Sequence, residues 1–340
     1  MRVGLYYDLR NPPPWRRDWA ALYAGVLDGI ERAEQQGISS IWVTEHHSFE
    51  DGYIGQPLQF CAAIASRTSR VRIGTAVLLA PLRPAIDIAE QSAMVDILSN
   101  GRLELGLGAG YRVPEFDVYG QDIGCRFQLM EERVREIRRL WADGIATPPP
   151  VQDPLPIWLG VMGPRGARIA GRLGTKLLWM QDDLVAPYER GLAEGGYDRS
   201  IARRGGLVNL LLADDPEAVW PRVVPHIAYQ RNSYNRYGAE GKADGMAGAL
   251  TLTAGEVDVE ALRERTGPPI SPRCDVVTPD EAIGRITAWL DGKPVEDIFL
   301  WASIAGMPDD IAERHCELVA TTLAPALRDV GIPVTDNVPI

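Results

Sequence analysis

Glu45, His46 and His47 are the residues of this sequence best suited to proton transfer, and they directly follow a predicted strand at residues 39–44. An imidazole titrates near neutral pH and therefore serves as a general acid or base. Adjacent strand residues point to opposite faces, so both histidines cannot easily bind one metal ion. The other two, His226 and His315, lack the spacing of a ligand set. We therefore predict no metal site, an acid/base role for the inward histidine, and a structural hydrogen-bonding role for at least one of the pair.

Glycines follow two further predicted strands. The stretch from Gly74 to Pro81 contains no titratable residue and reads as a buried, apolar wall. Gly106-Leu107-Gly108-Ala109-Gly110 has the spacing GxGxG, with Tyr111 where a dinucleotide fingerprint needs glycine, and Pro114 prevents a helix from following at once. We therefore expect these glycines to let the backbone approach a flat ligand.

The segment Gly160-Val161-Met162-Gly163-Pro164-Arg165-Gly166 opens a predicted helix. Free backbone N–H groups at a helix N-terminus, beside an arginine, suit a phosphate group. A plain strand-to-helix turn with proline in the first helical turn explains the same residues equally well. The motif alone leaves both interpretations open.

Short β-rich segments alternate with helical patterns along the whole chain, which is typical of strand–helix units around a parallel sheet. Eight such units favour a closed (β/α)8 TIM barrel over an open, doubly wound sheet. We expect one domain over residues 1–340, with an insertion at about 238–271 above the C-terminal face. The predicted strands are 2–7, 39–44, 71–76, 103–107, 156–160, 176–179, 207–212 and 297–301. The predicted helices are 19–35, 57–66, 86–98, 127–142, 165–173, 185–203, 216–237, 279–290 and 309–328.

Composition narrows the classes of partner and compartment. The 340 residues carry a net charge of −11, which argues against nucleic acid and anionic membranes as partners. Four scattered cysteines without a CxxC pair predict free thiols. No signal peptide pattern and no apolar run of about 18 residues is present. We expect a cytoplasmic protein with no membrane partner.

Four motifs together resemble the bacterial luciferase-like flavin-dependent oxidoreductases. The resemblance is continuous from Met1 to about Trp179, roughly half of the chain, with a family-typical last helix. The motifs are Val43-Thr44-Glu45-His46-His47, Ile73-Gly74-Thr75-Ala76-Val77, Gly101-Arg102-Leu103-Glu104-Leu105-Gly106-Leu107-Gly108 and Gly163-Pro164-Arg165.

This resemblance implies a flavin across the C-terminal mouth of the barrel and a non-prolyl cis peptide at Ala76–Val77 that props its ring. It implies His46 as the catalytic histidine and Glu45 as the adjacent carboxylate. Residues 162–165 would hold the phosphate. The residues it implies at the cofactor are Ala76, Val77, Gly108, Ala109, Gly110, Arg126, Val161, Met162, Gly163, Pro164, Arg165, Trp179 and Met180.

The sequence also departs from the luciferases. Gly108 stands where they have a reactive cysteine, and Ala109 stands where an arginine follows it. Met162 and Arg165 replace the serine and threonine of their phosphate loop. Light emission is therefore not implied.

Two kinds of enzyme fit the resemblance. In the first, a separate flavin reductase supplies reduced FMN, and O2 then oxygenates an organic substrate with His46 as the acid. In the second, a deazaflavin coenzyme exchanges a hydride with the substrate and His46 is the acid/base. Glu-His-His at residues 45–47 favours FMN, whereas Gly-Pro-Arg at 163–165 leans slightly to deazaflavin. A non-catalytic flavin-binding subunit is a third reading, against which the retained Glu45, His46 and Arg126 argue.

The loops at residues 10–17, 48–55, 112–125 and 238–271 would shape the substrate pocket. Trp15, Phe49 and Tyr53 in these loops, and Tyr111 just before one of them, suggest a small apolar or aromatic substrate. The resemblance also implies a homodimer packed through early helices. Residues 86–98 and the helix from Pro57 carry apolar side chains that fit such packing, although packing on the barrel explains them equally.

Overall fold

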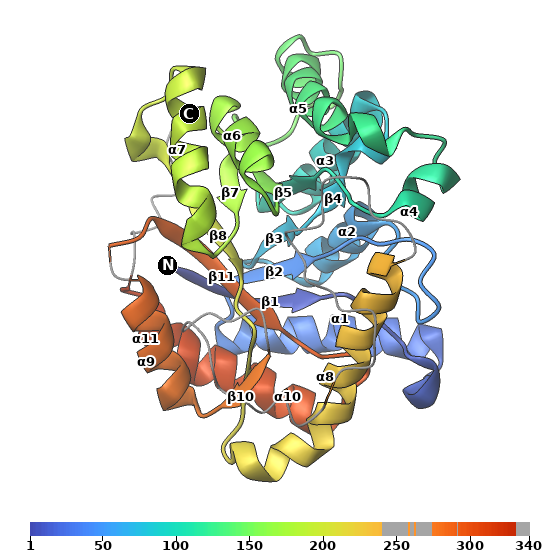
Figure 1. Cartoon of the computed structure of the whole chain (residues 1–340), viewed down its shortest axis with the longest axis vertical. Coiled ribbons are helices and arrows are strands. Elements are labelled where there is room, and N and C mark those ends of the chain that lie inside the picture. The colour runs from blue at the N-terminus through green and yellow to red at the C-terminus, as the bar shows by residue number, and fades with distance from the viewer. Residues whose placement is uncertain (240–257, 259–261, 263–273, 291, 331–340) are drawn as a thin grey trace.

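The chain forms a closed barrel of parallel strands surrounded by helices (Figure 1). The computed structural model describes residues 1–239, 258, 262, 274–290 and 292–330. Within them the strand order is β3-β2-β1-β11-β8-β7-β6-β5-β4, and β3 also pairs with β5, which closes the ring. Strands β3 and β4 share one position in the barrel. The (β/α)8 barrel predicted from the sequence is thus confirmed.

The barrel strands are short, and each ends at the same rim. Parallel pairing aligns Gly4 with Ser40, Trp42 with Gly74 and Gly106 with Trp158. The strands are β1 (Arg2–Tyr7), β2 (Ser40–Val43), β3 (Arg72–Thr75), β4 (Leu78–Leu79), β5 (Leu103–Gly108), β6 (Ile157–Gly160), β7 (Lys176–Leu178), β8 (Arg204–Leu207) and β11 (Val295–Trp301).

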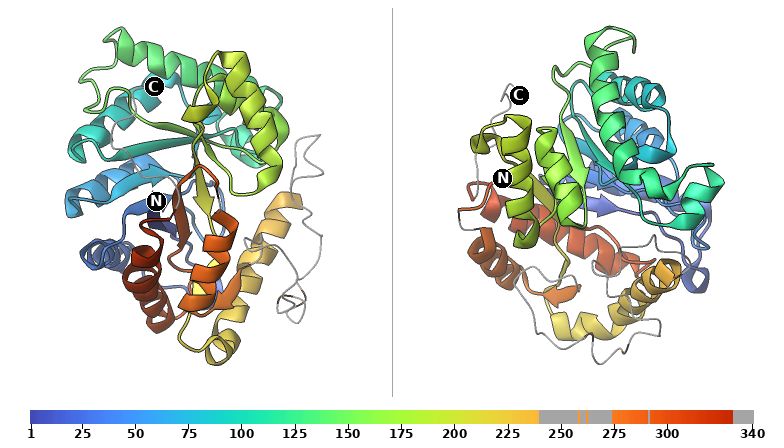
Figure 2. Two further views of the ribbon diagram at one scale, coloured as in Figure 1. Left: turned by 90° about the vertical axis from the view of Figure 1, so that its left-hand side faces the viewer. Right: turned by 45° about the horizontal axis from the view of Figure 1, so that its top comes forward.

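Helices cover the outside of the barrel, as the two turned views in Figure 2 show. Helix α1 begins where the Asp18 side chain accepts a hydrogen bond from Ala21 N (2.9 Å) and ends at Gly37 in the left-handed conformation, as the sequence predicts. The helices are α1 (Trp19–Gln36), α2 (Pro57–Arg67), α3 (Ala85–Leu98), α4 (Val113–Val118), α5 (Arg126–Ala142), α6 (Pro164–Arg172), α7 (Val185–Gly195), α8 (Pro216–Ala239), α9 (Pro279–Leu290), α10 (Asp309–Leu318) and α11 (Ala324–Leu327), with a π-helical turn at Val319–Leu323.

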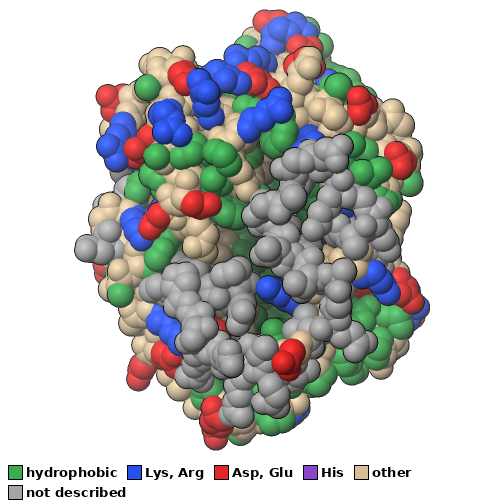
Figure 3. Space-filling view, in the orientation of Figure 1, with side chains coloured by type: hydrophobic (Ala, Val, Ile, Leu, Met, Phe, Trp, Pro, Cys, Tyr) green, Lys and Arg blue, Asp and Glu red, His purple; other side chains and the backbone are tan. Residues whose placement is uncertain are grey.

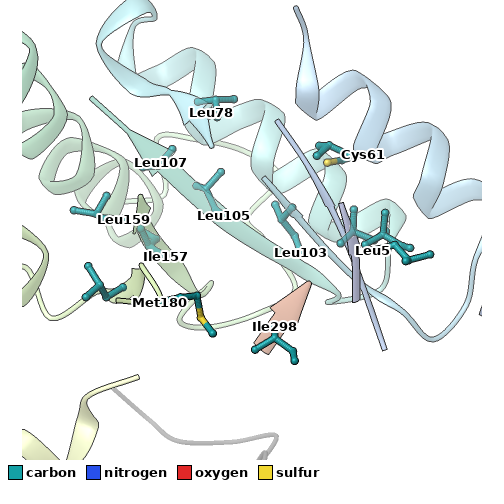
Figure 4. Packing of buried hydrophobic residues seen from close by; sticks show 14 of the residues in the cluster. Leu5, Cys61, Leu78, Leu103, Leu105, Leu107, Ile157, Leu159, Met180 and Ile298 are labelled. Carbon is teal, nitrogen blue, oxygen red and sulfur yellow. The ribbon is translucent and has the colours of Figure 1, made fainter. Parts of the chain in front are cut away.

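The main core lies between the strands and this helical layer. Side chains on the outer faces of the strands, such as Leu5, Leu105 and Leu159, are fully buried there (Figure 4). Met180 and Cys61 belong to the same cluster. Because strand side chains alternate between faces, the neighbouring residues of each strand fill the barrel interior.

Glycines and indole rings share the barrel interior. A Cβ atom on Gly74 would lie 2.3 Å from the Trp42 ring, so only glycine fits at this position. Trp42 and Trp158 pack edge to face with ring centroids 5.6 Å apart. Arg2 seals the N-terminal end through ion pairs with carboxylates that include Asp297 (2.8 Å). Within the described residues, side chains therefore fill the barrel interior. Chemistry is expected at the C-terminal mouth, as in other barrels of this type.

One strand was placed wrongly from the sequence. The seventh barrel strand is Arg204–Leu207, whereas the predicted strand 207–212 supplies β9 (Leu210–Leu212), which pairs outside the barrel with β10 (Asp275–Val277). Strand β8 contains two glycines that weaken any strand pattern. A Cβ atom on Gly205 would lie 2.4 Å from Asp297 O, so the close packing of strands requires this glycine.

One helical boundary was also wrong, and one short helix was missed. The predicted helix 185–203 ends at Gly195, because Gly196 turns the chain with a φ of +78°. The segment predicted as a loop at residues 112–125 contains α4. The predicted insertion at 238–271 lies almost entirely outside the described residues. None of the described helices is long and apolar enough to cross a membrane.

Candidate active site

His46 lies at the rim of the barrel and pairs with a buried carboxylate. The Trp42 side chain on β2 points into the barrel. Because side chains alternate along a strand, Thr44 and His46, which follow the strand, point inward as well. His46 Nδ1 lies 2.8 Å from Glu115 Oε1 of α4. A carboxylate only accepts, so this contact places the proton on Nδ1 and leaves Nε2 for chemistry.

Glu115 is held in its ionised form. The side chain is fully buried and also contacts His47 N (3.0 Å) and Arg112 Nη1 (3.1 Å). Burial raises the pKa of this carboxyl, but His46, the His47 N–H and Arg112 outweigh burial, and the net pKa is lowered. Glu115 thus fixes the tautomer and orientation of the His46 ring.

Aromatic rings surround His46 on the side of the mouth. The ring centroids of Tyr53, Phe49, Tyr111 and Tyr234 lie 4.8, 4.9, 5.6 and 6.4 Å from that of His46. Phe49 and Tyr53 come from the 48–55 loop predicted to shape the substrate pocket, Tyr111 directly precedes the 112–125 loop, and Tyr234 comes from α8. These rings enclose the imidazole in apolar surroundings.

Glu45 points away from this aromatic surface. Its Oε1 lies 2.6 Å from His47 Nε2 and 2.6 Å from Arg83 Nη1, and its Oε2 accepts a hydrogen bond from Leu79 N (2.7 Å). The carboxylate is buried on the outer side of β2. The structure thus separates the two residues predicted as catalytic: His46 faces the mouth, and Glu45 binds the backbone N–H of Leu79 at the end of β4.

The backbone between β3 and β4 has the predicted cis peptide at Ala76–Val77. Tyr6 Oη donates a hydrogen bond to Ala76 O (2.7 Å), which ties this bulge to β1 across the barrel. The Val77 side chain fits between two glycines. A Cβ atom on Gly108 would lie 2.3 Å from Val77 Cγ2, and one on Gly160 would lie 2.4 Å from Val77 Cγ1.

Gly108→Ala should therefore destabilise the protein, by about 1–3 kcal/mol, because Val77 is confined on both sides and cannot move aside. Thermal or urea unfolding measures the loss. Gly284→Ala is the matched control, since a Cβ atom at Gly284 meets nothing within 4 Å. Adding Val77→Ala should recover most of the loss. A Gly108→Ala protein as stable as the parent would contradict the tight fit of Val77.

Two arginines meet where α5 and α6 begin. The Cζ atoms of Arg126 and Arg165 lie 4.7 and 5.0 Å from the centroid of the Phe127 ring. Burial lowers the pKa of Arg126, and the neighbouring charge of Arg165 lowers it further. Arg126 Nε is buried and has no hydrogen-bond partner among the residues that the structure describes. Two close cations, an orphaned donor and the uncapped α6 N-terminus at Gly163 form a suitable anion site.

Basic side chains continue along the outside of α6. Lys and Arg side chains gather on this face in Figure 3, over α6 and α7. A groove of about 540 Å³ here is lined by residues that include Arg165, Arg168 and Arg172. Arg168 pairs with Glu194 (2.6 Å) and Arg172 with Glu131 (2.6 Å), so acidic neighbours compensate much of this charge.

The other residues predicted to contact the cofactor differ in burial and in the groups that they contact. Gly110 has a φ of +72°, and a Cβ atom there would lie 2.8 Å from the Phe116 ring. Trp179 Nε1 donates to Asp183 Oδ1 (2.7 Å), and Met180 is buried beside Gly206. Ala109 and Val161 are buried in the main core cluster, and Met162 is partly exposed just before α6.

Sequence reasoning missed four charged residues at the mouth: Asp8, Arg10, Arg112 and Glu115. Asp8 directly follows β1, so the rule that chemistry lies just beyond the strands could have found it. Arg10 and Arg112 lie in loops that were predicted only to shape the pocket. No local signal marks Glu115, because its partner His46 is 69 residues away in the chain.

The barrel thus places a histidine–carboxylate pair at its mouth and two arginines where α5 and α6 begin. A family model described as luciferase-like monooxygenase matches residues 10–322. The chain therefore belongs to the luciferase-like monooxygenase family, which confirms the predicted resemblance and extends it beyond Trp179.

Relatives in this family divide between two cofactor types. The chain is 30% identical over 172 residues (46% of this chain, 48% of the relative) to the oxygenase component of the flavin-dependent trigonelline monooxygenase of Acinetobacter baylyi. It is 36% identical over 175 residues (44% and 52%) to the F420-dependent glucose-6-phosphate dehydrogenase of Amycolatopsis mediterranei. The chain thus matches about half the length of these curated relatives.

Solved structures share the whole fold. The monooxygenase RslO1 from Streptomyces bottropensis superposes with a TM-score of 0.76 at 22% identity, covering 96% of this chain and 99% of that one. At this level of identity the likeness concerns the fold alone.

Proposed function

We propose that this protein is a flavin-dependent monooxygenase that takes reduced FMN from a separate flavin reductase and uses O2 to oxygenate a small apolar or aromatic substrate. The observation that carries the proposal is the His46–Glu115 pair, set among aromatic rings at the barrel mouth. Similarity to a flavin-dependent monooxygenase component supports it.

The residues present fit FMN. Arg126 and Arg165 at the α6 N-terminus would hold its phosphate, because the orphaned Arg126 Nε and the two adjacent cations require an anion. The Ala76–Val77 bulge, fixed by Tyr6, would support the flat ring. When bound, the flavin supplies the redox chemistry that activates O2.

The protein's own groups would manage protons and water. His46 Nε2 holds or delivers a proton at the mouth while Glu115 stabilises the charged imidazolium. Phe49, Tyr53 and Tyr111 exclude water and offer flat apolar surfaces to the substrate. Glu45 is a positioning residue that fixes Leu79 N and His47.

A deazaflavin-dependent hydride transfer is the second candidate. The similarity to an F420-dependent dehydrogenase favours it, and the same anion site would accept its phosphate. His46 would again be the acid/base.

Two measurements separate these functions. With supplied reduced FMN, O2 and candidate substrates we expect an oxygenated product that a protein-free control does not form, and we expect no reduction or oxidation of purified deazaflavin. Deazaflavin turnover without an oxygenated product would favour the second candidate, and failure to bind either cofactor would leave the non-catalytic subunit.

Arg165→Gln tests the phosphate contact separately. Loss of a charge-assisted hydrogen bond should weaken FMN binding about tenfold or more. Riboflavin, which lacks the phosphate, should bind both forms equally, and Arg168→Gln one turn further along α6 should leave FMN affinity unchanged. Equal loss for FMN and riboflavin would contradict a phosphate site here.

We further propose a homodimer packed through α3. Four apolar residues on this helix are exposed: Ile86, Met94 (60%), Ile97 and Leu98 (54%). A Met94→Glu, Leu98→Lys double variant should shift the protein from dimer to monomer in sedimentation velocity. Val118→Glu, at an exposed apolar residue of α4, should not. A wild-type chain that sediments as a monomer at micromolar concentration would refute the dimer.

A further inference from the structure

Two charged side chains at the barrel mouth keep buried polar atoms without partners. Asp8 Oδ2 and Arg10 Nη1 neither accept nor donate a hydrogen bond within the described residues. Asp8 is 5% exposed and Arg10 is 3% exposed. Leaving such an atom unsatisfied costs about 1–3 kcal/mol. An orphaned acceptor and an orphaned donor, two residues apart, need an explanation.

Asp8 stands directly above the support of the proposed flavin site. Tyr6 faces the barrel interior and bonds Ala76 O, and Asp8 lies two residues further along the same face. Its Oδ1 accepts a hydrogen bond from Arg10 N (3.2 Å), which fixes the carboxylate and leaves Oδ2 for another donor. Burial raises the pKa of Asp8 to about 6.

Hydrogen bonds fix two of the three guanidinium nitrogens of Arg10, and the third, Nη1, has no partner among the described residues. Its Nε donates to Asp51 Oδ2 (2.7 Å), and Nη2 donates to Ser233 Oγ of α8. The guanidinium carbon lies 5.5 Å from the ring centroids of Tyr53 and Tyr234. These contacts fix the plane of the group, so the direction of the Nη1 hydrogens is fixed as well.

The same aromatic rings lie beside His46 and beside Arg10, which carries one of the two unpaired atoms. Phe49, Tyr53 and Tyr234 contact the His46 ring, and the same three rings surround the Arg10 guanidinium at 5.5–5.6 Å. The unpaired donor of Arg10 and the imidazole of His46 therefore border the same aromatic cluster, against which a flat ring can pack.

We propose that Asp8 and Arg10 form a polar anchor that selects a flat aromatic substrate carrying an N–H or O–H donor next to a carbonyl oxygen. Asp8 Oδ2 accepts the substrate hydrogen, and Arg10 Nη1 donates to the carbonyl. The inference rests on the proposed function, since it names the substrate class for that site. Both residues are specificity determinants, and His46 remains the group at the reacting edge.

Four bicyclic probes of similar size test the anchor. 2-Quinolone has both groups, 1-methyl-2-quinolone only the acceptor, indole only the donor, and naphthalene neither. Calorimetry with the full-length protein, with and without FMN, should give 2-quinolone at least a tenfold lower Kd than 1-methyl-2-quinolone. Asp8→Ala should abolish that ratio, and Asp8→Asn, which keeps a weaker acceptor, should retain part of it.

Arg10→Gln should reduce binding of both quinolones but not of indole. Circular dichroism checks that each variant is folded, and the Asp8 variants decide the question where Arg10→Gln does not fold. Equal affinity for the two quinolones, a ratio that survives Asp8→Ala, or no binding of 2-quinolone at 1 mM would overturn the anchor. If FMN still binds in these cases, the proposed function stands. If the protein binds 2-quinolone more tightly than 1-methyl-2-quinolone but binds no flavin, the proposed monooxygenase function is overturned and the polar anchor stands.

Discussion

His46→Asn should lower turnover of an accepted substrate by about 10²–10⁴-fold, because the variant loses the acid/base group at the mouth. Asparagine keeps a polar side chain of similar size, so the fold and FMN affinity should change little. Formation of the oxygenated product with supplied reduced FMN, corrected for a protein-free control, measures the rate, and fluorescence quenching measures FMN binding.

His47→Asn is the matched control for this experiment. His47 is adjacent in sequence but faces outward and bonds Glu45 (2.6 Å). Its replacement should reduce turnover far less than that of His46. If both variants lost activity equally, the histidines would act through the local fold, and His46 would lose its assignment as the acid/base.

Glu115→Ala should destabilise the protein by about 3–5 kcal/mol, because it breaks a buried ion pair and leaves the Arg112 charge without that carboxylate. Glu115→Gln should be milder for stability yet still reduce turnover, since a neutral amide no longer stabilises a charged His46. Urea unfolding and formation of the oxygenated product measure the two effects.

The effect of Glu115→Gln on stability should depend on pH. The pKa of Glu115 is lowered in the folded protein, so the ionised carboxylate contributes stability above its unfolded value of about 4.3. That contribution is lost as the pH falls through the folded pKa. The stability gap between wild type and Glu115→Gln should therefore narrow from pH 7 towards acid. A gap that stays constant would show that Glu115 acts through packing.

Much of the barrel could be predicted from local sequence. Strands such as Arg2–Tyr7 and Leu103–Gly108 are recognisable by their apolar residues. Strand β8 could not be predicted, because Gly205 and Gly206 carry no side chains to form a pattern. Their role depends on Asp297 of β11 and on Met180, which lies just beyond β7.

From the residues alone, the site was predictable only where a residue directly follows a strand, as His46 does. The cis peptide at Ala76–Val77, which the structure has, was instead implied by the resemblance to the luciferase-like family. The Glu115 pairing depends on how α4 folds back over β2, and no pattern of nearby residues encodes that distance. The direction of Glu45 follows from alternation along β2, a rule that was applied to the histidines but not to their neighbour.

The tight seat of Val77 between Gly108 and Gly160 also limits how this protein can evolve. A side chain at position 108, such as the cysteine that luciferases carry there, is acceptable only after residue 77 has become smaller. The reverse order passes through an overpacked and unstable intermediate. In laboratory evolution of this protein, a smaller residue at position 77 should therefore appear before a side chain at position 108. The size of residue 77 thus controls whether a reactive side chain can be introduced at position 108.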